Sequence, residues 1–389
     1  MDAKLFANIL SDQHIINLNK LRYKYKDADM NEFVSLLSMS IYKELPIHDF
    51  GDHNLVYMDS VTQVRSMAVK LLLTPQSADA AFGLKAMEDE IASTLTIENI
   101  DFSRDSVRKI LRGSAPADES ENRIFGIKKG LDFIADQSNE ITEENIHALY
   151  ELAIAQTLPE EDRLIPGSFY RHDSVYIVGE GIEHSGLPHG KLTGHMGRLV
   201  EFINQDSSVG DLLKAAIIHF YIAFLHPYFE GNGRMARMIH LWYLIRQGYP
   251  SALFIPFSSY IERSRKGYYH AFTLVEDNAK ISGKIDVTPF LCYFIEHVYH
   301  KIGDYGPTPH TLTAYQSALR SGQVTEKERD LWNFVLSAYG VGAFSTKQLE
   351  RDFSNAAYAT IRGFVLKFEN LGILVSQKYG NRVKYSVIP

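Results

Sequence analysis

The twelve residues 226–237, HPYFEGNGRMAR, bring together the kinds of group that handle a phosphate. An apolar helix precedes them and ends at Pro227, because a residue before proline avoids helical geometry. A second helix is predicted from about Arg234 to Arg246. The glycine-rich loop between the two helices therefore lies at a helix N-terminus, where unpaired N–H groups and the helix dipole attract an anion.

The charged side chains of this stretch are spaced for one anion. Arg234 and Arg237 are three residues apart on the first turn, so both planar donor groups can face the same phosphate. Glu230 beside them is well placed only if a cation mediates, and Mg²⁺ takes a carboxylate together with phosphate oxygens. His226 can accept the proton of an attacking hydroxyl. The stretch predicts phosphoryl or nucleotidyl transfer.

Other interpretations of the stretch are weaker. The order of its residues is not the H-E-x-x-H of a zinc protease, and it lacks the G-x-x-x-x-G-K of a P-loop. The sequence GNG by itself is more often a structural loop between core helices, with solvated arginines nearby. That interpretation is disfavoured once the histidine, the acid and both arginines are in place.

The whole chain has the composition of a soluble globular protein, with 389 residues, 45% hydrophobic and 22% charged. Its net charge of −7 argues against a general binder of polyanions. The single cysteine, Cys292, lies in an apolar run and is expected to be structural, which fits a reducing compartment. The N-terminus shows no signal peptide, and the longest apolar stretch is interrupted by Lys214 and His219. We expect a cytoplasmic protein.

Helical periodicity dominates the chain and predicts a mostly α-helical fold. The exception before the C-terminal part is the β-rich SVYIVG at 174–179, which predicts a small hairpin. Breaks in the pattern divide the chain into an N-terminal helical region, a core, a linker and a C-terminal domain. The expected bounds are 1–115, 116–305, 306–323 and 324–389.

The C-terminal residues 324–389 show the order helix, turn, helix, hairpin, which is the winged-helix pattern. A capping box is expected at 345–348, and a hairpin turn at the Gly-Asn of KYGNR. These residues carry a net charge of +3, whereas the remainder carries −10. The change of sign supports a separate domain.

The stretch 226–237 resembles the signature of the Fic-domain family, H-x-F-x-[DE]-G-N-G-R-x-x-R, with Tyr228 in place of the usual phenylalanine. The resemblance covers about residues 80–305, and similar proteins often carry a winged-helix tail. It implies transfer of AMP from ATP to a hydroxyl side chain, of Tyr, Thr or Ser, on a target protein. It also implies Mg²⁺ as the metal ion.

The resemblance assigns a role to each polar residue of the stretch. His226 would be the general base, and Glu230 would hold Mg²⁺ between the α- and β-phosphates. The β-phosphate would bind Arg234 and the γ-phosphate Arg237. The residues expected to form the anion hole are Gly231, Asn232 and Gly233.

Two further stretches resemble family features. SVYIVG resembles the flap, a hairpin that docks the target backbone by strand addition, here through Val175, Tyr176 and Ile177. TLTIEN, at 94–99, resembles the inhibitory motif [ST]-x-x-x-E-[GN]. The resemblance implies that Glu98 pairs with the second arginine and keeps the γ-phosphate from binding correctly.

Several alternatives stay open at this point. The chain could be a winged-helix regulator that binds DNA, with the Fic core as a nucleotide sensor, or a Fic enzyme that transfers phosphate or phosphocholine. The winged helix could instead contact protein, and the enzyme could modify itself. Tyr268 and Tyr269 are loose candidates for contact with adenine. We expect no membrane partner.

Overall fold

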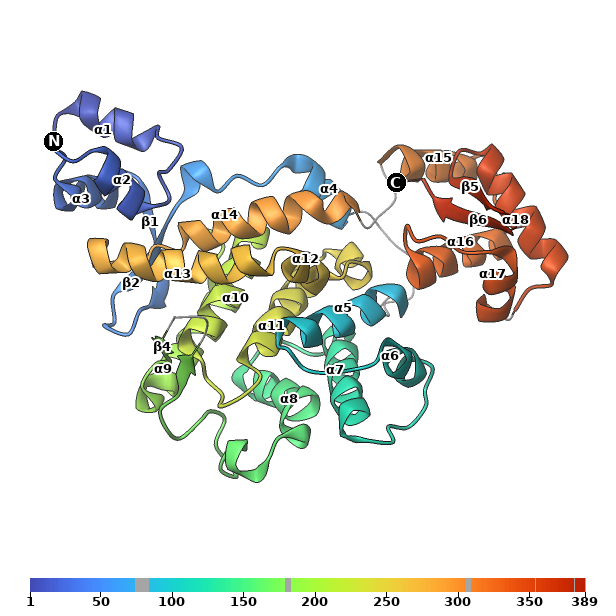
Figure 1. Cartoon of the computed structure of the whole chain (residues 1–389), viewed down its shortest axis with the longest axis horizontal. Coiled ribbons are helices and arrows are strands. Elements are labelled where there is room, and N and C mark those ends of the chain that lie inside the picture. Colours follow the sequence, from blue (N-terminus) through green and yellow to red (C-terminus); the bar gives the residue numbers. More distant parts are fainter. Residues whose placement is uncertain (74–83, 179–182, 305–308, 354, 381, 389) are drawn as a thin grey trace.

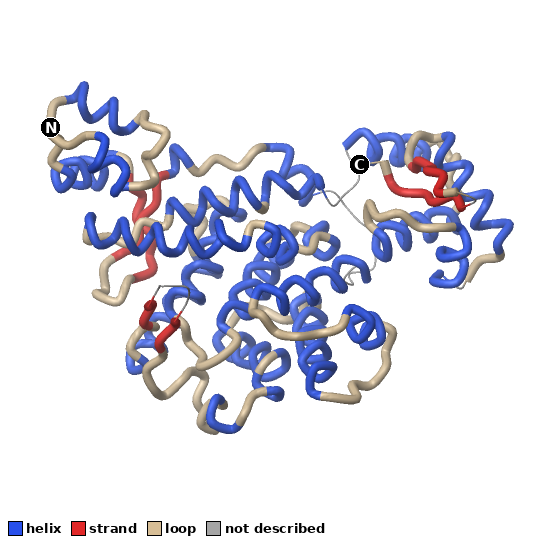
Figure 2. The backbone as a smooth tube through the Cα atoms, in the orientation of Figure 1, coloured by secondary structure: helices blue, strands red, loops and turns tan. Residues whose placement is uncertain are grey.

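The computed structural model describes residues 1–73, 84–178, 183–304, 309–353, 355–380 and 382–388. The fold is mostly helical, as predicted, and its strands form three separate two-stranded hairpins (Figures 1 and 2). In the part of the chain that is described, no helix is both long enough and apolar enough to cross a membrane.

The helices of the first half are α1 (Ala3–Leu10), α2 (Leu18–Lys24), α3 (Met30–Ser40), α4 (Ser66–Leu73), α5 (Leu84–Ile97), α6 (Arg104–Leu111), α7 (Glu119–Ala135), α8 (Glu143–Ala153) and α9 (Leu192–Gln205). Those of the second half are α10 (Asp211–Leu225), α11 (Asn232–Arg246), α12 (Phe257–Arg263), α13 (Arg265–Ser282), α14 (Thr288–His297), α15 (Pro309–Arg320), α16 (Glu326–Tyr339), α17 (Thr346–Phe353) and α18 (Tyr358–Asn370). The hairpins pair β1 (Tyr42–His48) with β2 (Asn54–Met58), β3 (Tyr176–Val178) with β4 (Glu183–Ser185), and β5 (Leu374–Tyr379) with β6 (Arg382–Val387).

Helices α10 and α11 form the centre of the core, where they pack against each other (Figure 1). Nearly every residue of α10 is buried, which explains why its sequence is apolar on most sides. The loop that joins the two helices is the motif loop, residues 226–231. Both ends of the loop are therefore held by helices that are largely buried and pack against each other.

Buried apolar residues form three clusters. One cluster continues from Leu45 to Ile302, a second joins residues of α1–α3 with Met58, and a third runs from Leu331 to Val387. The first cluster includes α5 and α6, because Ile91, Leu95, Val107 and Ile110 point into it. The core thus continues across residue 115, where the sequence led us to expect a boundary.

The β1–β2 hairpin lies in a region expected to be helical. In β1, Leu45 and Ile47 are buried while the residues between and before them are exposed, which is the two-residue period of a strand. The helical periodicity of α3 ends at Ser40, and the five-residue alternation after it was too short to distinguish from a further helical turn.

The C-terminal unit contains α17, α18 and the β5–β6 hairpin in the predicted order. The turn expected between the two helices includes Ser354, which lies outside the described residues. Ser345 accepts a hydrogen bond from the backbone N of Gln348 at 3.1 Å, as a capping residue does. The expected Gly-Asn turn includes Asn381, which lies outside the described residues. Residues 309–320, expected to be linker, instead form α15.

Helix α15 belongs to the C-terminal unit because its apolar side chains pack there. The Tyr315 ring lies 5.2 Å from the Trp332 ring and 6.3 Å from the Phe368 ring, and Thr311 Oγ1 donates to the Ile388 carbonyl at 2.9 Å. The prolines and glycines before α15 suggested a linker, whereas these packing contacts could not be read from composition.

Replacing Trp332 with alanine should destabilise the C-terminal unit by about 3–5 kcal/mol and leave the central core unaffected. Trp332 is 1% exposed and lies in the third cluster, which shares no residue with the first. Hydrogen exchange should accelerate for amides in 309–388 and stay unchanged in 84–302. Equal acceleration in both ranges would mean that the two clusters unfold as one unit.

Candidate active site

The motif loop begins and ends with a left-handed residue. His226 has φ 54° and ends α10, and Gly231 has φ 85° and precedes α11. Helix α11 begins at Asn232, two residues before the predicted start, because the left-handed glycine turns the chain directly into the helix. A Cβ at Gly231 would lie 2.6 Å from Ile154 Cγ2, so the position also has no room for a side chain.

Asn232 closes the loop on itself. Its Oδ1 accepts from the Tyr228 backbone N at 2.9 Å, and its Nδ2 donates to the Tyr228 carbonyl at 2.8 Å. The side-chain amide is thus used within the loop. The backbone N–H groups in the first turn of α11 have no partner within the helix. They are therefore the groups that can bind an anion here.

Tyr228, which stands where the signature usually has phenylalanine, is buried. Its ring stacks on Tyr150 of α8, with centroids 3.8 Å apart and planes 5° from parallel. The hydroxyls of Tyr228 and Tyr150 are buried without a hydrogen-bond partner among the described residues. This stacking holds the motif loop against α8, a contact that the sequence did not predict.

Both motif arginines are buried, and each keeps an unpartnered donor. Arg234 Nη2 donates to Glu230 Oε1 at 3.0 Å, while Arg234 Nε and Arg237 Nη1 are buried with no partner among the described residues. Arg234 is 3% exposed and Arg237 is 4% exposed. Unsatisfied buried donors are costly, so this arrangement suits an anion that brings oxygens to the site.

Glu98 is in contact with this same site. Arg237 Nη2 donates to Glu98 Oε1 at 2.5 Å, and Arg237 Nε donates to Thr94 Oγ1 at 2.8 Å. A Cβ at Gly233 would lie 2.4 Å from Glu98 Oε1, so the carboxylate lies against the first turn of α11. Burial acts to lower the pKa of Arg237, but the Glu98 carboxylate together with Tyr268 and Tyr269 leaves that pKa above its usual value.

Thr94 and Glu98 act together on Arg237 because they are four residues apart on one helical face. In the sequence Thr94 stood out only as the first letter of the motif, although its spacing from Glu98 could have assigned it a contact with Arg237. Asn99, the last letter, has φ 55°. Glycine and asparagine are the residues that adopt this conformation most easily at a helix end, which explains the [GN] position.

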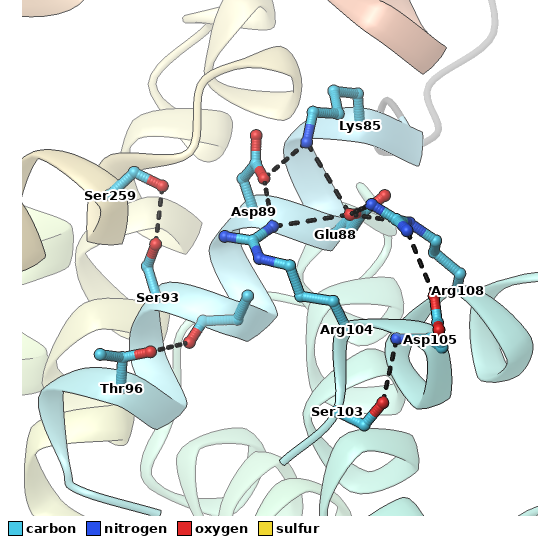
Figure 3. A network of polar contacts seen from close by, with 11 residues as sticks. Lys85, Glu88, Asp89, Ser93, Thr96, Ser103, Arg104, Asp105, Arg108 and Ser259 are labelled. Atoms are coloured by element: carbon cyan, nitrogen blue, oxygen red, sulfur yellow. Dashed lines mark hydrogen bonds and ion pairs between the residues drawn. The ribbon is translucent and has the colours of Figure 1, made fainter. Parts of the chain in front are cut away.

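Ion pairs hold the first half of α5 to α6 (Figure 3). Arg104 Nη1 lies 3.0 Å from Asp89 Oδ1, and Arg108 Nη2 lies 3.0 Å from Glu88 Oε1. Lys85 adds a bond to Asp89 at 2.7 Å within α5. The arginines are about half exposed, so each pair contributes modestly, but together they fix the start of α5, the helix that directly precedes Glu98.

Hydrogen bonds hold α5 to α12 on another side. Ser93 Oγ and Ser259 Oγ are 2.8 Å apart, and the Glu90 carboxylate accepts from the backbone N of Ser258 at 2.8 Å and from its hydroxyl. Burial raises the pKa of Glu90. Helix α5 is thus fixed to α6, α11 and α12, and Glu98 is positioned by all three.

His226 is oriented from two sides. Its Nδ1 lies 3.3 Å from the Ala223 carbonyl, which can only accept, so the neutral ring carries its proton on Nδ1 and a lone pair on Nε2. Its own carbonyl accepts from Arg171 Nε at 2.7 Å. The ring therefore has the tautomer required of a base that acts through Nε2.

The predicted flap is a hairpin. Strand β3 pairs antiparallel with β4, and Ile177 lies opposite His184. Tyr176 is 73% exposed and Val175 is half-buried, while Gly179, the last residue of SVYIVG, lies outside the described residues. The hairpin follows Arg171, the residue that binds the His226 carbonyl.

The two tyrosines considered for adenine differ in environment. Tyr268 is 3% exposed, and its hydroxyl is 2.8 Å from His219 Nε2 inside the core. Tyr269 is 41% exposed, and its hydroxyl donates to the Ile97 carbonyl at 3.4 Å, next to Glu98. Only Tyr269 has a surface that a nucleotide could contact.

Residues 140–244 match the model of the Fic/DOC family, and this range contains the motif loop and the flap. The chain therefore contains a Fic domain. It is 27% identical over 221 residues to "Protein adenylyltransferase Fic" of Drosophila ananassae, a match that covers 54% of this chain and 40% of that one. A protein of the same name from Drosophila willistoni is 27% identical over 183 residues, covering 46% and 32%. The chain thus spans about a third to two fifths of the length of these relatives.

Two solved structures align with part of this chain. A Fic family protein from Desulfovibrio desulfuricans G20 aligns with TM-score 0.48 and 18% identity, covering 84% of this chain and 97% of that one. Fic-1 (aa134 - 508) from C. elegans aligns with TM-score 0.48 and 20% identity, covering 67% and 74%.

Gly231→Ala should destabilise the protein more than Gly248→Ala, although both glycines have similar left-handed torsions, with φ 85° and 80°. At Gly248 nothing lies within 4 Å of an added Cβ, so only the backbone strain of about 1–2 kcal/mol applies. At Gly231 the clash with Ile154 adds to that strain. Urea unfolding of the two variants measures the difference, and equal losses would mean that the loop moves away from Ile154 at no cost.

Proposed function

We propose that this protein is a protein adenylyltransferase, which transfers AMP from ATP to a Tyr, Thr or Ser hydroxyl of a target protein. The observation that carries the proposal is the set of buried, unpartnered donors on Arg234 and Arg237 at the N-terminus of α11, beside a histidine of the correct tautomer. Such donors match the oxygens of a triphosphate. The names of the relatives support AMP as the transferred group.

In the proposed reaction the target hydroxyl oxygen attacks the α-phosphorus of ATP. A new P–O bond forms, the bond from the α-phosphorus to the bridging oxygen breaks, and pyrophosphate leaves. His226 Nε2 takes the hydroxyl proton. Backbone N–H groups at Gly231, Asn232 and Gly233 hold the α- and β-phosphate oxygens, Arg234 binds the β-phosphate, and Arg237 binds the γ-phosphate.

Glu230 is the residue proposed to hold Mg²⁺. Its side chain is half exposed beside Arg234, which fits a ligand shared between the protein and a bound triphosphate. In the described residues no group of three His, Cys, Asp or Glu could hold a metal ion without such help. When bound, Mg²⁺ would neutralise charge on the α- and β-phosphates.

Glu98 is proposed to inhibit the enzyme by competing with the γ-phosphate for Arg237. The contact at 2.5 Å uses one of the donors that the phosphate requires. A carboxylate there also repels a triphosphate. ATP is then held with its α-phosphorus out of line, and poor alignment lowers the rate more than the affinity.

The target protein is proposed to dock on the flap by adding a strand to β3, with Val175, Tyr176 and Ile177 as the docking residues. The C-terminal unit is proposed to be a winged-helix domain that contacts proteins. The exposed face of α18 carries Tyr358 and Leu366, both more than 40% exposed, which favours a protein partner over DNA.

Incubation with α-labelled and γ-labelled ATP in parallel tests the transferred group. Label from the α-position alone should stay on protein, either on an added target or on the enzyme itself. Label from the γ-position alone would indicate phosphate transfer and would overturn the proposal. The test is best made with Glu98→Gly, in which the proposed inhibition is removed.

His226→Ala should lower transfer by about 10²–10⁴-fold and leave ATP binding nearly intact, because the ring handles the acceptor proton and not the phosphates. His53→Ala, at a 77% exposed side chain, is the control and should be neutral. Labelled AMP incorporation and the Kd for ATP decide between outcomes. Transfer near the parent rate would refute the role of His226.

Glu98→Gly should raise self-adenylylation strongly, with a gain in turnover that exceeds any gain in ATP affinity. Glu98→Gln, which keeps the shape and loses the charge, should give an intermediate gain. Adding Arg237→Ala to Glu98→Gly should remove most of the increase, because the released arginine aligns the γ-phosphate. If Glu98→Gly labels no faster than the parent, Glu98 is an ordinary residue at a helix end.

Glu230→Ala should raise the Mg²⁺ concentration needed for half-maximal transfer, because it removes the carboxylate of the motif loop. Activity is measured against Mg²⁺ concentration in the Glu98→Gly background. An unchanged Mg²⁺ requirement would assign the metal to a different ligand.

A further inference from the structure

Arg171 is a buried arginine that forms no ion pair among the described residues. It is 2% exposed, and all three of its side-chain nitrogens donate to backbone carbonyl oxygens. Carbonyls carry only partial charge, so a buried guanidinium held by them alone is costly and calls for a reason. Arg171 has no role in the transfer reaction proposed for this site.

The three carbonyls come from the two structures that must meet in the reaction. Arg171 Nε donates to the His226 carbonyl at 2.7 Å. Nη1 donates to the carbonyl of Asp173 at 2.5 Å, and Nη2 donates to that of Leu187. Asp173 precedes the first flap strand and Leu187 follows the second, so one planar group joins both ends of the flap to the histidine.

Backbone contacts close the same junction. Arg171 N donates to the Pro227 carbonyl at 2.9 Å, and Leu187 N donates to the Leu225 carbonyl at 3.0 Å. The residue between these two carbonyls, His226, has the unfavourable left-handed φ of 54°. For a residue other than glycine such a conformation persists only where its surroundings enforce it, and the bond to its carbonyl does so.

Gly186 completes the junction by having no side chain. An added Cβ would lie 2.8 Å from Arg171 Nη2 and 3.1 Å from His226 Cβ. The guanidinium, the histidine and the end of the flap are therefore packed so closely around Gly186 that a side chain at this position would clash with them.

We propose that Arg171 is a positioning residue that couples the flap to His226, so that a target strand docked on the flap presents its hydroxyl to a ring held at a fixed distance from it. This inference rests on the proposed function. Arginine is required because its planar group presents several donors at fixed angles, whereas lysine offers a single point of charge.

The test compares variants in the Glu98→Gly background. Arg171→Met keeps the length and apolar bulk of the side chain but has no donor, Arg171→Lys keeps the charge, and Gly186→Ala displaces the same group without changing it. Arg163→Met is the matched control, because Arg163 lies on the same segment and also donates to a carbonyl, that of Leu158 at 3.0 Å, while remaining exposed.

Arg171→Met and Arg171→Lys should each lower kcat by about 100-fold, since misplacement of a reacting group costs this much, with the Kd for ATP unchanged. Gly186→Ala should lower kcat in the same direction, and Arg163→Met should be neutral. A variant with normal kcat, or a loss confined to ATP affinity, would overturn the inference. If Arg171→Met does not fold, Arg171→Lys and Gly186→Ala decide.

A second measurement separates this inference from the proposed function. The imidazole ¹⁵N resonances of His226, identified by their loss in His226→Ala, are recorded without nucleotide. They should shift in both Arg171 variants and stay unchanged in Arg163→Met. If the Glu98→Gly parent transfers nothing, the proposed function fails, and the resonances alone decide whether Arg171 positions His226. Unshifted resonances would refute that role.

Discussion

The bond between Arg237 and Glu98 joins the helix that carries the motif to the helix that ends beside it, and much of the surrounding structure follows from it. Arg237 is 4% exposed, and an anionic partner offsets much of the cost of burying its guanidinium. In this structure Glu98 supplies part of that partner, and it can do so only if α5 lies across the first turn of α11. The ion pairs to α6 and the hydrogen bonds to α12 keep α5 in that place.

The motif loop is rigid for reasons that are independent of α5. Its two left-handed residues are each held, His226 through its carbonyl and Gly231 by close packing on Ile154, and the Asn232 side chain fixes the backbone between them. The first turn of α11 is therefore arranged for an anion before one arrives, which is the condition for effective electrostatic stabilisation. If Glu98 inhibits as proposed, the inhibited and active states should thus differ in the position of Glu98, and not in the shape of the loop.

The parts of the site that could be predicted from the sequence are those whose determinants are local. The loop was readable because proline, glycine and a three-residue arginine spacing each act over a few residues, and Glu98 was readable from a six-residue motif. The contacts of Arg171 with His226 and of Tyr150 with Tyr228 join residues far apart in the chain and leave no local pattern. Helical periodicity was sufficient to predict most elements of the fold. Hairpin β1–β2 was missed because it is too short for its period to stand out. The short helical piece that forms α15 was assigned to the linker because it follows a run of breakers.

Thr94 bears on the inhibition proposed for Glu98. Its hydroxyl accepts from Arg237 Nε at 2.8 Å and its carbonyl accepts from Arg237 Nη2 at 3.4 Å, and neither bond involves the Glu98 carboxylate. If Glu98 alone oriented the guanidinium, moving Glu98 away would leave a loose arginine that must lose side-chain entropy again to bind a γ-phosphate. With Thr94 present, the group should stay aimed at the first turn of α11, with Nη1 available to an incoming phosphate. The Glu98 side chain is also 26% exposed, so water can solvate it as it leaves. These two properties favour an inhibitory contact that can be displaced by a triphosphate, over one that blocks the site permanently.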